Sequence, residues 1–361
     1  MHAMNYEKLV AILSEPHPEC NPSSPQIYAI IQRMSHSDPA TGRRDFLKGA
    51  CLAGFMVATA KLPAAEGARF EVGKRGAHSR LAMSYAVVDI GLAKPFSVLH
   101  ISDTHLASAY PDEHPDKIAA AARRSQGFGG RQEEALAESL EWARHNTDYV
   151  IHTGDLIDFQ SRANFDLVRK YWGEAMFGSV GNHEFYSYTK DEVRGRTEEF
   201  KSRSWKMLDD LRPVNPRFAS RIVNGVNFIA IDDVFGAVQP DQVEKFKAEV
   251  QKGLPIVLCM HVPFFTPSVA LATHKYWRRT GKKFEGRPDP SKPPKEGGDL
   301  WNQLNDPDTA GFIAYLKQEK LLKAILSGHE HLTMEERFSP TAVQYLVGGN
   351  FLFAARELLF V

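Results

Sequence analysis

Cysteine, net charge and long hydrophobic runs are all scarce in this sequence. Three of its 361 residues are cysteine, Cys20, Cys51 and Cys259, which excludes a disulfide scaffold and a zinc module built from four cysteines. The 44 Lys and Arg residues equal the 44 Asp and Glu residues in number, so no overall positive field would attract nucleic acid, and we expect no stable nucleic-acid binding. No run of about eighteen apolar residues occurs, which excludes a polytopic membrane protein.

Three widespread catalytic motifs are missing as well. The sequence contains no Gly-x4-Gly-Lys-Ser/Thr, no Gly-x-Ser-x-Gly and no His-Glu-x-x-His, which excludes a P-loop protein, a serine hydrolase with a nucleophile elbow and a zincin. With 43% hydrophobic residues, the composition is that of a globular protein with a core of ordinary size. Histidine is the residue type that stands out, at fourteen.

Residues 1–60 differ from the rest of the chain and resemble a twin-arginine export signal. The segment 43–47 reads Arg-Arg-Asp-Phe-Leu, and the small and apolar run that follows, Gly49–Ala60, is too short to span a bilayer stably. Residues 58–60 read Ala-Thr-Ala, a small-x-small cleavage site that predicts a mature start near Lys61. The alternative is a buried N-terminal helix that contains a chance Arg-Arg pair.

A removable leader changes what is left of the chain. It would take Cys20 and Cys51 with it, which suits an exported protein without disulfides. We therefore expect export by the twin-arginine machinery to the periplasm or another extracytoplasmic compartment, with no transmembrane segment after leader removal. The stretch before Met34 is long for the basic region of such a signal, so we also expect translation to begin at Met34.

From about residue 80 onward, short β-branched or aromatic runs alternate with longer polar, helix-like segments, which predicts an α/β fold. The predicted strands are Ser84–Ile90, Phe96–Ser102, Tyr149–Thr153, Ala175–Val180, Val226–Ile231, Ile256–Met260, Ala324–Leu326 and Val343–Val347. The predicted helices are Gln132–His145, Asp241–Gln251 and Asp308–Lys320.

These patterns divide the mature chain into two parts. Residues 61–95 are expected to form an N-terminal linker and the first strand, and residues 96–361 are expected to form one domain. Within that domain, residues 266–306 are rich in Pro, Gly, Lys and Arg and lack periodicity, so we predict an ordered, lid-like loop there.

Polar residues with metal-binding side chains follow five of the predicted strands. They are Asp103 and His105, Asp155, Asn182 with His183, His261, and His329 with His331. In an open α/β sheet the carboxyl ends of the strands share one rim, where ligands bind. The sequence therefore predicts that these residues meet at one place.

Singly these signals are weak, but as a set they closely resemble the calcineurin-like metallophosphoesterase family over about residues 96–350. The motifs are Asp103-x-His105, Gly154-Asp155-Leu156-Ile157-Asp158, Gly181-Asn182-His183-Glu184, His261 and Gly328-His329-Glu330-His331. The resemblance implies the metallophosphoesterase fold, a layered β-sandwich flanked by helices with a metal site at the C-terminal ends of the strands.

The resemblance also implies a dinuclear metal centre. One ion would bind Asp103, His105 and His331, the other would bind Asn182, His261 and His329, and Asp155 would bridge them. A hydroxide bound by both metals would attack phosphorus in line. Purple acid phosphatases have a tyrosine at the position of Asp158, so the aspartate here favours Mn2+, Fe2+, Zn2+ or a mixed pair.

Three further residues receive roles from the same resemblance. His183 would be the general acid or transition-state donor, and Glu184 would orient it. Glu184 could equally be a charge at a helix N-terminus. Asp158 would be either a partner of the metal ligands or a turn cap.

The implied function is hydrolysis of a small phosphate ester, with a diester slightly preferred over a monoester. Phosphomonoesterase and nucleotide pyrophosphatase activities remain alternatives within the enzyme class, and a non-catalytic scaffold with the same fold is the alternative outside it.

Several residues near the motifs have plainer interpretations. His100 and His152 lie within strands, so we expect them in the core and not as metal ligands. Cys259 is expected to pack in the interior. Asp232 and Asp233 close a strand and are expected to cap the following turn.

Overall fold

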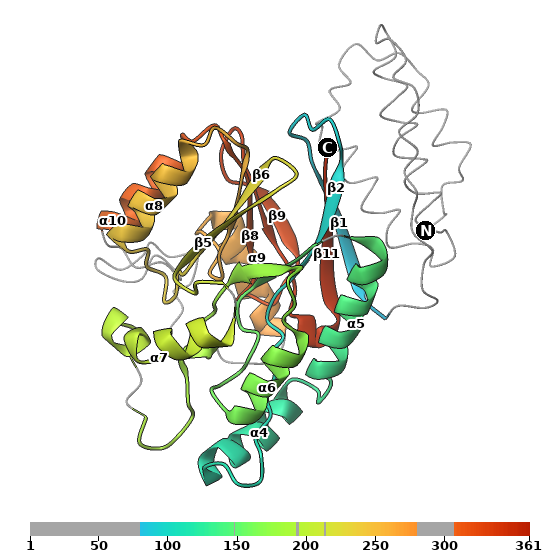
Figure 1. Ribbon diagram of the computed structural model, residues 1–361, viewed down its shortest axis with the longest axis vertical. Coiled ribbons are helices and arrows are strands. Elements are labelled where there is room, and N and C mark those ends of the chain that lie inside the picture. The colour runs from blue at the N-terminus through green and yellow to red at the C-terminus, as the bar shows by residue number, and fades with distance from the viewer. Residues whose placement is uncertain (1–79, 148, 193–194, 213, 280–306) are drawn as a thin grey trace, which may run out of the picture. The chain divides into compact units, whose positions relative to one another are not determined.

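The computed structural model describes residues 80–147, 149–192, 195–212, 214–279 and 307–361. The chain divides into two units, Met1–Val72 and Gly73–Val361, and all of the described residues belong to the second. That unit contains two multistranded sheets flanked by helices, which confirms the predicted α/β class (Figure 1). The predicted leader, residues 1–60, lies outside the described residues.

The first sheet has five strands in the order β1-β11-β2-β3-β4. They are β1 (Ala82–Val88), β11 (Ala354–Phe360), β2 (Phe96–Ile101), β3 (Tyr149–Thr153) and β4 (Met176–Ser179). β2, β3 and β4 run parallel to one another, while β11 pairs antiparallel with β2 and parallel with β1. The carboxyl ends of β2, β3 and β4 therefore lie at one edge of this sheet.

The second sheet has six strands in the order β5-β6-β7-β8-β10-β9. They are β5 (Phe218–Val223), β6 (Val226–Ile231), β7 (Ile256–Cys259), β8 (Leu322–Ser327), β10 (Val343–Leu346) and β9 (Met334–Arg337). β6, β7, β8 and β10 are parallel, and the two edge strands pair antiparallel. The central strands are apolar because parallel strands of this kind are covered on both faces.

Aromatic side chains from both sheets fill the space between them. Phe96 of β2 and Phe360 of β11 stack with their ring centroids 5.0 Å apart. Phe228 of β6 packs edge-on against Phe360 at 5.6 Å and against Phe96 at 6.4 Å. All three are buried, so this cluster joins the two sheets into one core.

Helices cover the outer faces of the sandwich. They are α4 (Pro115–Gly127), α5 (Gln132–Asn146), α6 (Arg162–Tyr171), α7 (Glu198–Leu211), α8 (Pro240–Val250), α9 (Pro267–Arg279) and α10 (Pro307–Leu316), with short 3-10 turns at His183–Phe185 and Asn350–Leu352. α5 lies against β2 and β3, and α8 lies against β5 and β6. α8 and α10 lie side by side, where Phe246 packs edge-on against Phe312 (Figure 1). No helix in the described ranges is both long and apolar enough to cross a bilayer.

Strongly patterned segments were predicted better than the others. All eight predicted strands and all three predicted helices are present, although α10 ends at Leu316 and not at Lys320. Three strands, β5, β9 and β11, and four helices, α4, α6, α7 and α9, have no counterpart in the prediction.

The predicted lid-like loop, residues 266–306, is helical in its first part. α9 begins at Pro267, and its side chains Val269 and Ala270 are buried against Leu332 and Leu346. The apolar face of α9 is short, and the segment 266–306 is otherwise rich in Pro, Gly, Lys and Arg. The sequence therefore shows no clear helical period there. The rest of the predicted loop, residues 280–306, lies outside the described residues.

A buried ion pair ties α7 to the second sheet. The Lys201 ammonium is 2.6 Å from Asp232 Oδ2 and 2.5 Å from Glu198 Oε1, and the side chain is 1% exposed. Burial raises the pKa of Asp232 to about 6, against the attraction of Lys201. Without the lysine, Asp232 would be an uncompensated buried charge.

Lys201→Met is therefore expected to lower the free energy of unfolding by about 3 kcal/mol, measured by chemical denaturation. Lys206→Met on the same helix is the matched control, because Lys206 is 88% exposed and its ion pair with Asp210 lies in solvent. The control should unfold at the same denaturant concentration as the wild type. An equal loss of unfolding free energy in the two variants would show that the buried ion pair stabilises the fold no more than the exposed one.

Candidate metal centre

The loops that follow five strands bring the predicted ligand residues together. Asp103 and His105 follow β2, Asp155 follows β3, and the loops after β4, β7 and β8 carry the others, which are Asn182, His261, His329 and His331. The histidine nitrogens and carboxylate oxygens form three overlapping groups, within each of which the atoms lie within 4.8 Å of one another. The groups are Asp103, His105 and His331; Asp155, His261 and His329; and His105, Asp155 and His183.

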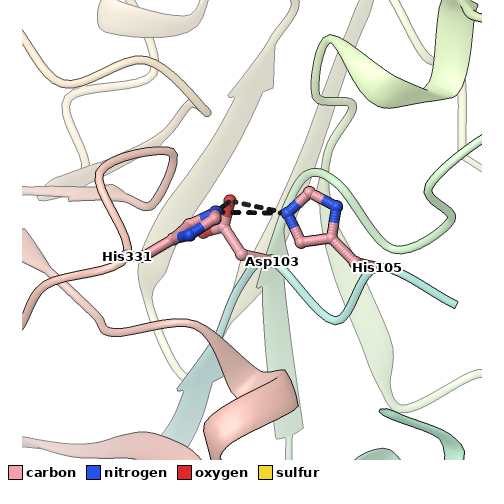
Figure 2. Close-up of side chains that lie close together, drawn as sticks. All are labelled: Asp103, His105 and His331. Carbon is pink, nitrogen blue, oxygen red and sulfur yellow. Dashed lines mark hydrogen bonds and ion pairs between the residues drawn. The ribbon is translucent and has the colours of Figure 1, made fainter. Parts of the chain in front are cut away.

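The Asp103 carboxylate lies between two histidine rings (Figure 2). Its Oδ1 atom is 3.3 Å from Nε2 of His331 and 3.8 Å from Nε2 of His105. The two Nε2 atoms are 3.2 Å apart. Atoms of three side chains from two loops therefore converge, and nitrogen and carboxylate donors of this kind suit a divalent cation.

Asp155 faces His261, which is in its own group with His329, and His105, which is also in the group of Asp103. Its Oδ2 atom is 3.3 Å from Nε2 of His261 and 3.7 Å from Nε2 of His105. Nε2 of His261 is in turn 3.2 Å from Nδ1 of His329. Within the described part of the chain, Oδ1 of Asn182 is buried without a hydrogen-bond partner, as expected of an oxygen reserved for a cation.

In His261 and His105, hydrogen bonds at Nδ1 leave Nε2 as the nitrogen that can bind a metal. Nδ1 of His261 lies 2.7 Å from the carbonyl oxygen of Thr153, which can only accept a hydrogen bond. Nδ1 of His105 lies 2.9 Å from Oδ1 of Asp158. Each ring therefore donates from Nδ1 and directs Nε2 toward the carboxylates. Once Nε2 loses its proton, it is the nitrogen free to bind a metal. The residues present fit divalent ions.

The charges of the cluster are strongly coupled. Asp103 and Asp155 are 0% and 2% exposed. Burial lowers the pKa of His261, but Asp155 and Asp103 outweigh it and raise that pKa to about 10. Burial raises the pKa of Asp155, but His261 and His183 hold it well below its usual range. Two buried carboxylates thus draw positive charge to this point.

Many of the candidate ligands have left-handed backbone conformations. The φ angles of five of them lie between 52° and 65°, at Asp103, His105, Asp155, His329 and His331. Non-glycine residues adopt this region at a cost of about 1–3 kcal/mol each, and such residues cluster at functional sites. His329 and His331 are both left-handed, and their side chains belong to different groups.

Glu184 holds two of these loops together. Its carboxylate accepts hydrogen bonds from the backbone N–H groups of Gly181 at 2.7 Å, Asp155 at 3.0 Å and Leu156 at 2.7 Å. The predicted role was to orient His183, but the hydrogen bonds of the carboxylate go to the backbone. Gly181 permits the close approach, since a Cβ atom there would lie 2.2 Å from Asp155 Oδ1.

His183 is oriented by Asp158 and Tyr188. Its Nδ1 atom is 2.9 Å from the carbonyl oxygen of Asp158, 3.1 Å from Oδ1 of the same residue and 3.0 Å from the hydroxyl of Tyr188. Burial lowers the pKa of His183, but Asp155 and Asp158 raise it to about 9. Asp158 is thus a partner of both His183 and His105, and this contact favours the first of its two predicted roles.

Two residues that no sequence motif marks also support the centre. Asp233 accepts hydrogen bonds from the backbone N–H groups of His261 at 2.9 Å and Val262 at 3.1 Å, and burial raises its pKa to about 7. The sequence predicts a turn cap for Asp233, but its place after β6, at the same rim as the ligands, gives it this role instead. Arg124 binds Asp158 and was missed because α4 itself was not predicted.

Two histidines and a cysteine near the motifs lie in the interior, as expected. His100, His152 and Cys259 are fully buried, and neither histidine belongs to a candidate metal group. His100 pairs with the Thr153 hydroxyl at 2.9 Å, and His152 pairs with the Thr104 hydroxyl at 3.0 Å. Burial, followed by Arg212, lowers the pKa of His152 to about 3, so it remains neutral.

The chain is similar to known proteins in sequence and in structure. The sequence model described as calcineurin-like phosphoesterase matches residues 96–332. No curated protein sequence matches the chain significantly. Among solved structures, the chain is similar to a dimetal phosphatase from Danio rerio, with 13% identity, a TM-score of 0.42, and 71% of this chain and 88% of that chain covered.

Two other solved structures are similar at the same level. A phosphopantetheinyl hydrolase from Mycobacterium tuberculosis has 15% identity and a TM-score of 0.39, with 71% of this chain and 91% of that chain covered. A 5'-nucleotidase from Candida albicans has 13% identity and a TM-score of 0.36, with 71% of this chain but only 46% of that chain covered. Because these TM-scores are below 0.5, the assignment rests on the family match.

The matched segment, residues 96–332, includes all seven candidate ligands and His183. All of these residues except Asn182 belong to the groups that could hold metal ions. The chain therefore belongs to the calcineurin-like phosphoesterase family and is a hydrolase that acts on phosphate esters.

Proposed function

We propose that the protein hydrolyses a phosphodiester with two divalent cations bound at the rim of its sheets. The observation that carries the proposal is the position of Asp155, whose carboxylate faces His105 of the group with Asp103 and His261 of the group with His329. One cation would bind Asp103, His105 and His331, the other would bind Asn182, His261 and His329, and Asp155 would contact both. The pair would be Mn2+, Fe2+, Zn2+ or a mixture of these.

When bound, the cations would lower the pKa of water and neutralise charge on the phosphate. The protein's own part is to hold the ligands and to move a proton. The Nδ1 atom of His183 is engaged by Asp158, so Nε2 is the nitrogen placed to donate a proton to the leaving oxygen. Glu184 and Asp233 hold the loops on which Asp155 and His261 lie.

This donor supports hydrolysis of a phosphate ester of an alcohol, whether the phosphate carries one ester bond or two. A phosphodiester loses an alkoxide, which is a poor leaving group unless it is protonated as the bond breaks. The presence of all seven candidate ligands and His183 also opposes a purely structural role for the fold.

The first test compares p-nitrophenyl phosphate with bis(p-nitrophenyl) phosphate in the presence of Mn2+. We expect a higher kcat/KM for the bis-ester, and Asp155→Asn should lower kcat by more than about 100-fold because it weakens the ligand shared by both cations. Asp209→Asn is the matched control, since Asp209 is exposed on α7 and belongs to no candidate metal group. A higher kcat/KM for the monoester would contradict the diester proposal, and full activity of Asp155→Asn would contradict the metal mechanism.

The second test examines the proton donor by changing the leaving group. His183→Ala should lower kcat by about 100-fold or more for a diester that expels an alkoxide, but much less for one that expels p-nitrophenolate, which needs no proton. His145→Ala on α5, an exposed histidine, should retain wild-type rates. Equal losses for both leaving groups would rule out general-acid catalysis by His183.

We further propose that the protein is exported by the twin-arginine pathway to the periplasm or another extracytoplasmic compartment. Support comes from the sequence alone, in the Arg-Arg pair at 43–44, the apolar run 49–60 and the small residues before Lys61. Export in the folded state would allow metal loading in the cytoplasm. A start at Met34 would leave this signal intact.

N-terminal sequencing of the protein from the extracytoplasmic fraction should give a mature start near Lys61. Replacing Arg43 and Arg44 together with lysine should leave the uncleaved precursor in the cytoplasm. Recovery of a mature chain that retains residues 43–60, or unchanged export of the double variant, would contradict this proposal.

A further inference from the structure

Arg124 extends from the last turn of α4 to the edge of the candidate metal centre. Its Nε atom donates to Oδ2 of Asp158 at 2.6 Å, and its Nη2 atom donates to Oδ1 at 2.8 Å. The Asp158 side chain is 0% exposed, whereas the Arg124 side chain is 31% exposed. A two-point contact between guanidinium and carboxylate fixes the plane of the carboxylate as well as its distance.

The carboxylate that Arg124 fixes also supports two histidines with different roles. Oδ1 of Asp158 is 2.9 Å from Nδ1 of His105, a candidate metal ligand, and 3.1 Å from Nδ1 of His183, the proposed proton donor. In the described structure, Oδ2 has Arg124 as its hydrogen-bond donor. Rotation of this carboxylate would therefore disturb both rings, and Arg124 opposes that rotation.

Arg124 also contacts the aromatic neighbours of the same two histidines. Its guanidinium carbon lies 4.8 Å from the ring centroid of Phe128 and 5.6 Å from that of Tyr188. Phe128 stacks on His105 with centroids 4.2 Å apart and planes inclined by 14°. The Tyr188 hydroxyl is 3.0 Å from Nδ1 of His183. Arg124 thus contacts each histidine indirectly in two ways, through the Asp158 carboxylate and through an aromatic residue.

We propose that Arg124 is a positioning residue that holds His105 and His183 in a fixed mutual orientation through Asp158. The inference rests on the proposed function for the role of His183, but the hold on His105 is independent of catalysis. It predicts that loss of Arg124 weakens metal binding and slows turnover together. Lysine should replace it only in part, because an ammonium group lacks the planar fork that contacts both oxygens.

The test uses the full chain with Arg124→Gln, Arg124→Lys and, as a matched control, Arg123→Gln. Arg123 is the exposed neighbour on the same helix. Mn2+ is titrated calorimetrically into each metal-free protein, and kcat and KM are measured with a diester that expels an alkoxide. Arg124→Gln should weaken Mn2+ binding and lower kcat by about 10-fold or more each, with KM unchanged. Arg124→Lys should fall between it and the wild type, and Arg123→Gln should match the wild type.

Three results would overturn the inference. A folded Arg124→Gln variant with wild-type Mn2+ affinity and kcat would show that Asp158 needs no such partner. A rise in KM alone would show that Arg124 contacts the substrate instead. If Arg124→Gln fails to fold, Arg124→Lys keeps a cation beside Asp158, and wild-type Mn2+ affinity in that variant would overturn the inference. A wild-type chain inactive on every ester would refute the proposed function, while the Mn2+ titration would still test the hold on His105.

Discussion

The burial of two carboxylates at one point is the constraint on which the rest of the structure depends. Asp103 and Asp155 are almost completely enclosed, and a buried charge without compensation costs several kcal/mol. The first sheet supplies both carboxylates, and the loops of the second sheet supply His261, His329 and His331. Because the hydrogen bond from His261 to Thr153 joins the two sheets at this rim, the compensating groups are in place only when the sandwich is assembled.

A shell of acidic residues keeps the ligand loops in their strained conformations. Glu184, Asp158 and Asp233 bind backbone N–H groups and imidazoles, and none of the three is among the candidate ligands. The ligands themselves could be identified from the sequence, because each stands in a short motif directly after a strand. The hydrogen-bond partners of the three acidic residues could not be identified in this way. Glu184, for example, lies beside His183 in sequence, yet its carboxylate contacts the loop after β3. Such pairings depend on how separate loops approach one another.

The same distinction applies to the fold. β6, with six buried residues in succession, is recognisable from its apolar run. β11 is not, because Ala-Ala-Arg-Glu-Leu-Leu at 354–359 consists of good helix formers, and only its pairing between β1 and β2 makes it a strand. β9 reads Met-Glu-Glu-Arg and is defined by its pairing with β10. β11 and β9 are strands because of their pairing with other strands, and the local sequence pattern does not encode that pairing.

The central claim is that the rim binds two cations that share Asp155. Anomalous diffraction from crystals of the Mn2+-loaded protein tests it most directly. We expect two peaks about 3.5–4 Å apart, one beside Asp103, His105 and His331 and the other beside Asn182, His261 and His329. A single peak, or two peaks of which only one contacts Asp155, would contradict the account.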